Sequence, residues 1–186
     1  MTWVEDGVRS IPLFGRPLGT PDGSRRESSS AVLPEFIIGP ENRLLGTAVE
    51  SVLESTVPSY SPLVLYGPSG CGKSHVATGL VAAWTAASRR RTALYLTALD
   101  FARELHDALE TQTLDDFRER CRRTSLFVIE DVGLLAEKPA AQRELVTTLD
   151  ACEEEGKFVV VTASAAPAQL AGLIPALTSR LSGGLL

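Results

Sequence analysis

A run of eight residues has the types and the spacing of a phosphate-binding loop. In chain order the run is Gly67, Pro68, Ser69, Gly70, Cys71, Gly72, Lys73 and Ser74. Glycines let backbone N–H groups turn toward phosphate oxygens, and the amino-terminal end of a following helix favours negative charge. We expect Lys73 to reach the β- and γ-phosphates of a nucleoside triphosphate, and Ser74 to ligate Mg²⁺. The run therefore predicts binding of ATP or ADP with Mg²⁺, and a flexible glycine turn before an ordinary helix is the alternative.

Two acids, Glu130 and Asp131, end a strongly apolar run that starts at Leu126. A segment of this kind, called Walker B, delivers carboxylates to the sheet edge where the Mg²⁺ of a nucleotide would lie. One carboxylate can orient metal-bound water, and the next can polarise the water that attacks the γ-phosphate. The pair therefore predicts catalytic acids, with Glu130 near the metal and acting partly through water. A solvated strand end that happens to be acidic is the alternative.

Two further residues are candidates for contacts with the transferring phosphoryl group. Ser164 follows the apolar run that starts at Phe158, and its hydroxyl could hydrogen-bond the attacking water or the γ-phosphate. A plain turn before Pro167 would explain the same residue. Arg180 could complete the site of a neighbouring molecule by stabilising charge on the phosphoryl group. An ordinary surface cation is the alternative for Arg180.

Four short apolar runs alternate with helical patterns and would position these residues. The runs are Leu63–Tyr66, Ala93–Thr97, Leu126–Glu130 and Phe158–Thr162. Helical patterns cover roughly 74–88, 99–110, 114–122 and 140–155, and an earlier helix begins near Asn42 and ends before Pro58. Runs that are apolar throughout are typical of strands buried on both faces, so we predict an α/β fold of the P-loop NTPase type, a parallel sheet flanked by helices. Because parallel strands end at one edge, Gly67, Asp131 and Ser164 should lie together.

Composition and charge restrict the compartment and the partners. The chain has 186 residues, 44% of them hydrophobic, which suffices for one sizeable core. Residues 1–34, rich in proline, glycine and serine, are expected to be a flexible leader to a domain over 35–186. A formal net charge of −5 does not favour a protein that coats nucleic acid. Three cysteines without paired spacing, no signal peptide and no spanning apolar run predict a cytoplasmic protein without a membrane partner.

From about Leu33 to Leu186 the sequence resembles the AAA+ ATPase domain of the bacterial replication initiators, the DnaA family. Besides the phosphate loop and the two acids, the resemblance is carried by Phe36–Arg43, Ser61–Gly67, Lys73–His75, Ala93–Phe101, Asp116–Arg120 and Arg180–Leu185. It implies an AAA+ base subdomain, which is an αβα three-layer sandwich, with ATP binding, slow hydrolysis and head-to-tail self-association. For single residues it implies that Ile38, Asn42 and His75 border the nucleotide, that Asp131 is the catalytic base, and that Arg180 contacts a neighbour's nucleotide.

The sequence departs from the family pattern at several positions. Glu130 replaces an aspartate, Ala163-Ser164 replaces a Ser-Asp pair, and Ala176 replaces an arginine, so we expect weak hydrolysis. The sequence also stops at Leu186, before the helical lid and the DNA-binding domain of the family, and we expect both to be absent.

The partners follow less directly from the residues. The segment that corresponds to the family's contact region for single-stranded DNA is acidic over 110–116, although Arg118, Arg120, Arg122 and Arg123 lie nearby. The main interpretation is a DnaA-like ATPase core that acts in replication initiation through ATP-dependent assembly. A non-catalytic nucleotide-sensing adaptor, similar to DnaA-related regulators or helicase loaders and acting on other replication proteins, is the second. A vestigial domain that binds no nucleotide is the third.

Overall fold

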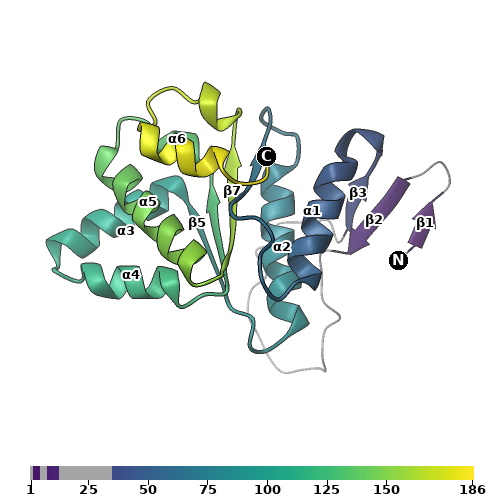
Figure 1. Cartoon of the computed structure of the whole chain (residues 1–186), viewed down its shortest axis with the longest axis horizontal. Helices are drawn as coiled ribbons and strands as arrows, with labels where there is room; N and C mark the ends of the chain where they lie inside the picture. The colour runs from purple at the N-terminus through teal and green to yellow at the C-terminus, as the bar shows by residue number, and fades with distance from the viewer. Residues whose placement is uncertain (1, 5–7, 13–34) are drawn as a thin grey trace, which may run out of the picture.

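The computed structural model describes residues 2–4, 8–12 and 35–186 (Figure 1). The strands are β1 (Thr2–Val4), β2 (Val8–Pro12), β3 (Glu35–Ile38), β4 (Leu63–Tyr66), β5 (Ala93–Thr97), β6 (Leu126–Glu130) and β7 (Phe158–Ala163). The α-helices are α1 (Arg43–Glu54), α2 (Lys73–Ala87), α3 (Ala98–Glu110), α4 (Leu114–Arg122), α5 (Pro139–Glu154) and α6 (Pro175–Ser182). Short 3₁₀ helices are η1 (Pro40–Asn42), η2 (Val132–Leu135) and η3 (Pro167–Gln169).

Four parallel strands form the central sheet, in the order β4-β7-β6-β5. Figure 1 shows α1 and α2 on one face of this sheet and α3 to α6 on the other. The predicted α/β fold, a parallel sheet flanked by helices, is therefore confirmed. The predicted bounds of β4, β5 and β6 agree with the structure, and β7 runs one residue further than predicted, to Ala163.

Successive residues of the inner strand β6 point into opposite layers. Leu126 and Val128 belong to the core cluster under α1 and α2, whereas Phe127 and Ile129 belong to the cluster under α3 to α6. Burial on both faces explains why the strand lacks an alternation of polar and apolar residues. By the same period of two, Glu130 at the end of β6 lies on the α2 side of the sheet. This orientation determines which side chains the carboxylate of Glu130 can contact.

A second, antiparallel sheet has the order β1-β2-β3 and precedes α1 in the chain. A flexible leader was expected over 1–34, and the strands β1 and β2 within this range were not predicted; the division into a leader and a domain from residue 35 stays a prediction. Short runs of valine, isoleucine, threonine and tryptophan favour strands. Backbone pairing of β1 with β2, and of β2 with β3, completes this sheet. These runs are too short to stand out in the average composition of residues 1–34. The other residues of 1–34 lie outside the described part of the chain.

The buried side chain of Gln142, on α5, joins two loops at the carboxyl edge of the central sheet. Its amide nitrogen donates to the carbonyl oxygens of Leu135 (2.8 Å) and Gly172 (2.9 Å), and its amide oxygen accepts from the backbone N–H of Ile174 (2.6 Å). We expect Gln142→Leu to lower the free energy of unfolding by about 2–4 kcal/mol, because three backbone groups would lose their partner in a buried place. Equilibrium denaturation by urea would measure the change.

The matched control is Gln169→Leu, since Gln169 is exposed at the end of η3. We expect its stability to stay within about 0.5 kcal/mol of the wild type. Equal effects of the two substitutions would contradict a special role of the Gln142 hydrogen bonds.

Candidate functional site

The phosphate-binding loop joins the carboxyl end of β4 to the amino-terminal end of α2. Gly70 and Gly72 have φ angles of +81° and +93°, a conformation in which residues with a side chain are strained. The backbone N–H of Gly67 donates to the carbonyl oxygen of Ala163 (3.3 Å), which ties the start of the loop to the end of β7. The predicted order of strand, loop and helix is therefore present.

Lys73 is held over the loop by the backbone that it follows. Its ammonium group donates to the carbonyl oxygens of Gly67 (2.7 Å) and Pro68 (2.8 Å) and lies 3.8 Å from the sulfur of Cys71. These bonds keep the cation at the mouth of the loop, where the phosphates of a nucleotide would replace the carbonyl oxygens as partners. The position of Lys73 thus suits the predicted phosphate contact.

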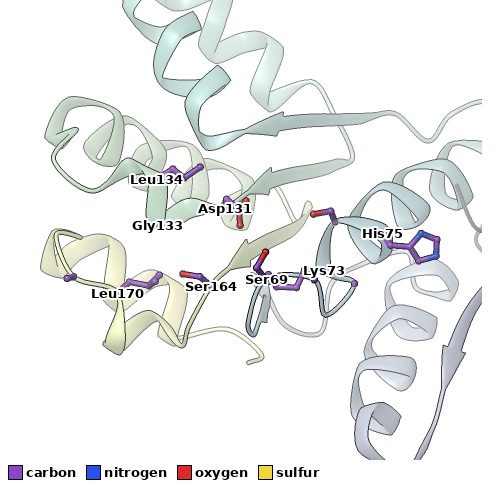
Figure 2. Close-up of a pocket in the computed structure, with 12 residues that line it drawn as sticks. Ser69, Lys73, His75, Asp131, Gly133, Leu134, Ser164 and Leu170 are labelled. Carbon is purple, nitrogen blue, oxygen red and sulfur yellow. The ribbon is translucent and has the colours of Figure 1, made fainter. Parts of the chain in front are cut away.

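The two acids at the end of β6 have different surroundings. Asp131 adopts a left-handed conformation with φ of +55°, and its backbone N–H donates to the hydroxyl oxygen of Thr162 on β7 (2.9 Å). Its side chain is directed into a cavity beside the phosphate loop (Figure 2). Glu130 is 9% exposed, accepts a hydrogen bond from the Tyr95 hydroxyl on β5, and does not line that cavity. Only Asp131 of the pair therefore faces the space where phosphates would bind.

A cavity of about 540 Å³ gathers the ends of three strands. Its walls are Ser69, Gly70, Gly72, Lys73, Ser74 and His75 from the loop and α2, Asp131, Gly133 and Leu134 after β6, and Ser164, Leu170 and Ala171 after β7. Figure 2 shows Asp131, Ser164 and Ser69 around one space, whereas the imidazole of His75 points away from them. The expected meeting of the phosphate loop, Asp131 and Ser164 at the carboxyl edge is present. No local signal in the sequence singled out Leu134 and Leu170.

A smaller, apolar cavity of about 170 Å³ lies on the other side of the phosphate loop. It shares Gly72 and Lys73 with the first cavity and is otherwise lined by Leu44, Leu45, Ala48, Leu63, Val64, Leu65, Tyr66, Cys71, Val76, Leu185 and Leu186. An apolar slot next to a phosphate-binding loop has the character that a flat aromatic base requires. The two cavities together therefore offer separate surroundings to a charged and to an apolar part of one ligand.

The family model of the bacterial DnaA ATPase domain matches residues 29–186 of the chain. The chain belongs to this family. A chromosomal replication initiator protein DnaA from Thermomicrobium roseum is 32% identical to it over 152 residues, which are 82% of this chain and 33% of that protein. The chain thus spans about a third of the length of the curated DnaA proteins that it matches.

Solved structures of DnaA proteins have the same fold. Domain III of the Thermotoga maritima replication initiation protein DnaA has a TM-score of 0.76 at 28% identity, over 81% of this chain and 62% of that one. The replication initiator DnaA bound to AMPPCP and single-stranded DNA has a TM-score of 0.74 at 31% identity, over 81% of this chain and 47% of that one. These likenesses agree with the AAA+ base subdomain that the resemblance implied.

Two residues that the resemblance to DnaA proteins placed near the nucleotide have structural contacts here. Ile38 is 2% exposed and packs against Gly46 of α1 so closely that a side chain at position 46 would collide with it. The side-chain oxygen of Asn42 accepts from the backbone N–H of Gly39 (2.7 Å) and closes η1. Neither residue lines the two cavities described above. A role of Ile38 and Asn42 in nucleotide binding stays a prediction, and they support the position of α1 beside the smaller cavity.

Arg180, the predicted finger residue of this DnaA domain, lies on α6 and outside both cavities. Its guanidinium group contacts the carboxylate of Asp150 on α5 at 2.5 Å, and this contact raises the pKa of Arg180 above its usual range. Half of the side chain is exposed. The structure therefore does not bring Arg180 to the phosphate loop of its own molecule.

The three cysteines differ in solvent exposure, and this difference allows a chemical test of whether the phosphate loop is accessible. Burial raises the pKa of the thiols of Cys121 and Cys152 to about 11, whereas Cys71 is exposed in the phosphate loop. We expect iodoacetamide at neutral pH to label Cys71 and to spare the buried thiols, because the thiolate is the reactive form. Peptide mass spectrometry would locate the label, and denatured protein, labelled at all three positions, is the control. Equal labelling of all three in the folded protein would contradict the packing.

Proposed function

We propose that this chain is a DnaA-type ATP-binding core that hydrolyses ATP slowly and acts in replication initiation through ATP-dependent assembly. The observation that carries the proposal is the convergence of Lys73, Ser74, Asp131 and Ser164 on one cavity at the carboxyl edge of the sheet. A cation, a hydroxyl at a helix start, a carboxylate and a second hydroxyl are the groups that phosphoryl transfer needs. Membership of the DnaA ATPase-domain family and a DnaA structure that holds AMPPCP support the nucleotide.

Mg²⁺ fits the oxygen donors at this site. Ser74 supplies a hydroxyl ligand on the cavity wall, and Asp131 supplies a carboxylate that can accept a hydrogen bond from a metal-bound water. Within residues 2–4, 8–12 and 35–186, no three acids, histidines or cysteines gather into a metal cluster of their own. This donor set suits Mg²⁺, which is commonly held by one or two protein groups, waters and the phosphates of its nucleotide. When bound, the ion would neutralise charge on the phosphate oxygens.

The residues of the chain have separate roles in the proposed hydrolysis. Lys73 holds the β- and γ-phosphates, and the backbone N–H groups of the loop surround their oxygens. Asp131 accepts a hydrogen bond from the attacking water and increases its nucleophilicity, while the Ser164 hydroxyl orients that water or the γ-phosphate. The apolar cavity beside Leu45 and Tyr66 takes the adenine ring.

Calorimetric titration with ATP, ADP and inorganic triphosphate tests the binding part of the proposal. We expect micromolar affinity for ATP and ADP, and binding of triphosphate at least about tenfold weaker, because triphosphate lacks the base that would fill the apolar cavity. AMP is the complementary control, because it keeps the adenine base and offers only one phosphate to the loop. A protein that gives no heat with ATP would refute the proposal and favour a domain without nucleotide binding.

The proposal also includes self-association of the chain. Arg180 is exposed on α6 and lies away from its own phosphate loop, so it is available to the nucleotide of a neighbouring copy after releasing Asp150. We expect Arg180→Ala protein, mixed with wild type, to lower any turnover that depends on assembly. Arg89→Ala, which removes an exposed arginine just after α2, is the control. Turnover that stays equal in both mixtures would contradict a contribution of Arg180 to a neighbour's site.

Single-stranded DNA is the proposed partner of a groove between α3 and the start of α5. The groove has a volume of about 440 Å³, exposes the apolar side chains of Leu99 and Leu109, and includes Lys138 and Arg143. Arg103 also lines it but pairs with Asp100 (2.7 Å). Apolar surface next to cations suits the bases and the phosphates of a single strand. The structure of a DnaA protein with single-stranded DNA supports this partner.

Three of the four arginines in and just after α4 that were considered for DNA, namely Arg118, Arg120 and Arg123, are engaged with acids of the same chain. Arg118 makes two hydrogen bonds to Glu144 on α5 (2.7 and 2.8 Å), Arg120 pairs with Glu104, and Arg123 with Glu119 (2.6 Å). We therefore expect Lys138→Ala and Arg143→Ala to weaken binding of a fluorescent oligo-dT several-fold and to lower its salt dependence. Arg89→Ala should change neither quantity. Equal losses for all three variants would refute the groove.

A nucleotide-sensing adaptor is the second candidate, and the contact between Glu130 and Tyr95 favours it. A carboxylate engaged with a neighbouring strand is a poorer metal ligand and slows hydrolysis without preventing binding. Nucleotide binding without measurable turnover would support the adaptor.

We further propose a cytoplasmic location, which agrees with the free cysteines Cys71, Cys121 and Cys152. Among the residues that the structure describes, none of the helices combines the length and the apolar character that crossing a bilayer requires.

A further inference from the structure

A tyrosine on the neighbouring strand holds the first of the two acids. Tyr95 on β5 pairs with Val128 of β6, two residues before Glu130. Residues two apart lie on the same face of a strand, so the ring of Tyr95 runs along the α2 side of the sheet toward Glu130. The Tyr95 hydroxyl donates to one carboxylate oxygen of Glu130. The ring itself packs against the core cluster under α1 and α2, which leaves it little freedom to move.

The strand order shows in which direction this hydrogen bond draws the carboxylate. In the sheet, β6 lies between β7 and β5, and β4 lies beyond β7. The phosphate loop and Ser74 follow β4, whereas Tyr95 belongs to β5 on the opposite side of β6. The hydrogen bond therefore turns Glu130 away from Ser74. This agrees with the cavity walls, which include Ser74 and Asp131 but not Glu130.

We propose that Tyr95 is a positioning residue that keeps Glu130 away from the magnesium position, so that Mg²⁺ must compete with the tyrosine hydroxyl for this carboxylate. The inference rests on the proposed nucleotide site and adds a control on its metal dependence. A hydroxyl donated to a carboxylate is a charge-assisted hydrogen bond and is strong for a neutral donor. As a consequence, Mg²⁺ strengthens nucleotide binding less in this protein than it would with a free carboxylate at position 130.

The test is the ratio of ADP affinities in Mg²⁺ and in EDTA, measured by calorimetry. Tyr95→Phe keeps the packed ring and removes the hydroxyl. We expect the ratio to rise about tenfold in this variant, while the affinity in EDTA stays the same. Tyr60→Phe is the matched control, because the Tyr60 hydroxyl also makes a single hydrogen bond, to the carbonyl oxygen of Ala48 (3.0 Å), which lines the smaller, apolar cavity and not the larger cavity with Ser74 and Asp131. Its ratio should equal that of the wild type.

Substitutions at Glu130 show whether the effect passes through this carboxylate. Glu130→Gln should lower the ratio, and adding Tyr95→Phe to Glu130→Gln should change it no further. Glu130→Asp shortens the side chain so that it no longer reaches Tyr95, and it should raise the ratio even if Tyr95→Phe does not fold. This second route does not depend on the stability of the Tyr95 variant.

Each other outcome has a definite meaning. An unchanged or lower ratio in Tyr95→Phe, with ADP bound normally in EDTA, would overturn the role of Tyr95 and leave the nucleotide site intact. A lower ratio in particular would mean that Tyr95 orients Glu130 as a metal ligand. A wild-type protein that binds ADP neither with Mg²⁺ nor with EDTA would overturn the proposed function, and the Tyr95 proposal with it.

Discussion

Lys73→Ala is expected to weaken ATP binding by at least about 100-fold, or about 2.7 kcal/mol. Lys73 lies on the wall of the larger cavity, and its ammonium group is already held at the mouth of the phosphate loop by two carbonyl oxygens. Its removal leaves the phosphate charge to the backbone N–H groups and to Mg²⁺ alone. Calorimetric titration with Mg·ATP would measure the loss, and circular dichroism would show that the variant is folded.

Lys157→Ala is the matched control for this substitution. Lys157 pairs with Glu155 (2.9 Å) just before β7, and hence at the opposite end of the sheet from the phosphate loop. We expect its ATP affinity to equal that of the wild type. If Lys73→Ala bound ATP as tightly as Lys157→Ala, the nucleotide would not lie in the loop, and the proposed site would be wrong.

Asp131→Asn is expected to lower the rate of ATP hydrolysis by about 10²–10⁴-fold and to leave ATP affinity within a few-fold of the wild type. The amide keeps the shape of the side chain but is a much weaker proton acceptor. Asparagine also tolerates the left-handed conformation of residue 131, so the hydrogen bond from its N–H to Thr162 should survive. Single-turnover assays with radiolabelled ATP would measure the chemical step apart from product release.

The control for the carboxylate is Asp115→Asn, since Asp115 is a fully exposed acid of α4. It should hydrolyse ATP at the wild-type rate. A wild-type rate no higher than that of Asp131→Asn, with ATP still bound, would reject the ATPase and support the nucleotide-sensing adaptor.

The sequence predicted the parts of the structure that depend on local pattern. The strands around Val64, Val128 and Val160 are apolar except near their carboxyl ends, and such runs have few alternatives to a buried parallel strand. The glycines before Lys73 restrict the loop by backbone conformation alone, so its place after β4 could be predicted. The shared edge of parallel strands then brought Asp131 and Ser164 to the loop without further information.

The contacts that were missed depend on register and packing between distant segments. The hydrogen bond from Tyr95 to Glu130 requires the alignment of β5 with β6, which the two sequences do not specify. The pairing of Arg118 with Glu144 requires the packing of α4 on α5, and it removes a cation that looked available for DNA. The short strand β2 pairs with β3, farther along the chain, and β1 in turn pairs with β2. Local composition contains none of these relations.

The end of β7 connects the two halves of the site. Thr162 accepts from the backbone of Asp131, and the next residue, Ala163, accepts from Gly67 at the start of the phosphate loop. The chain then runs along the cavity wall through Ser164 and Leu170 to α6, which carries Arg180. We therefore expect β7 to couple these parts: a shift of this strand when the γ-phosphate leaves would move Asp131 and the phosphate loop together, and would also move α6 with Arg180, the residue proposed to contact a neighbouring molecule.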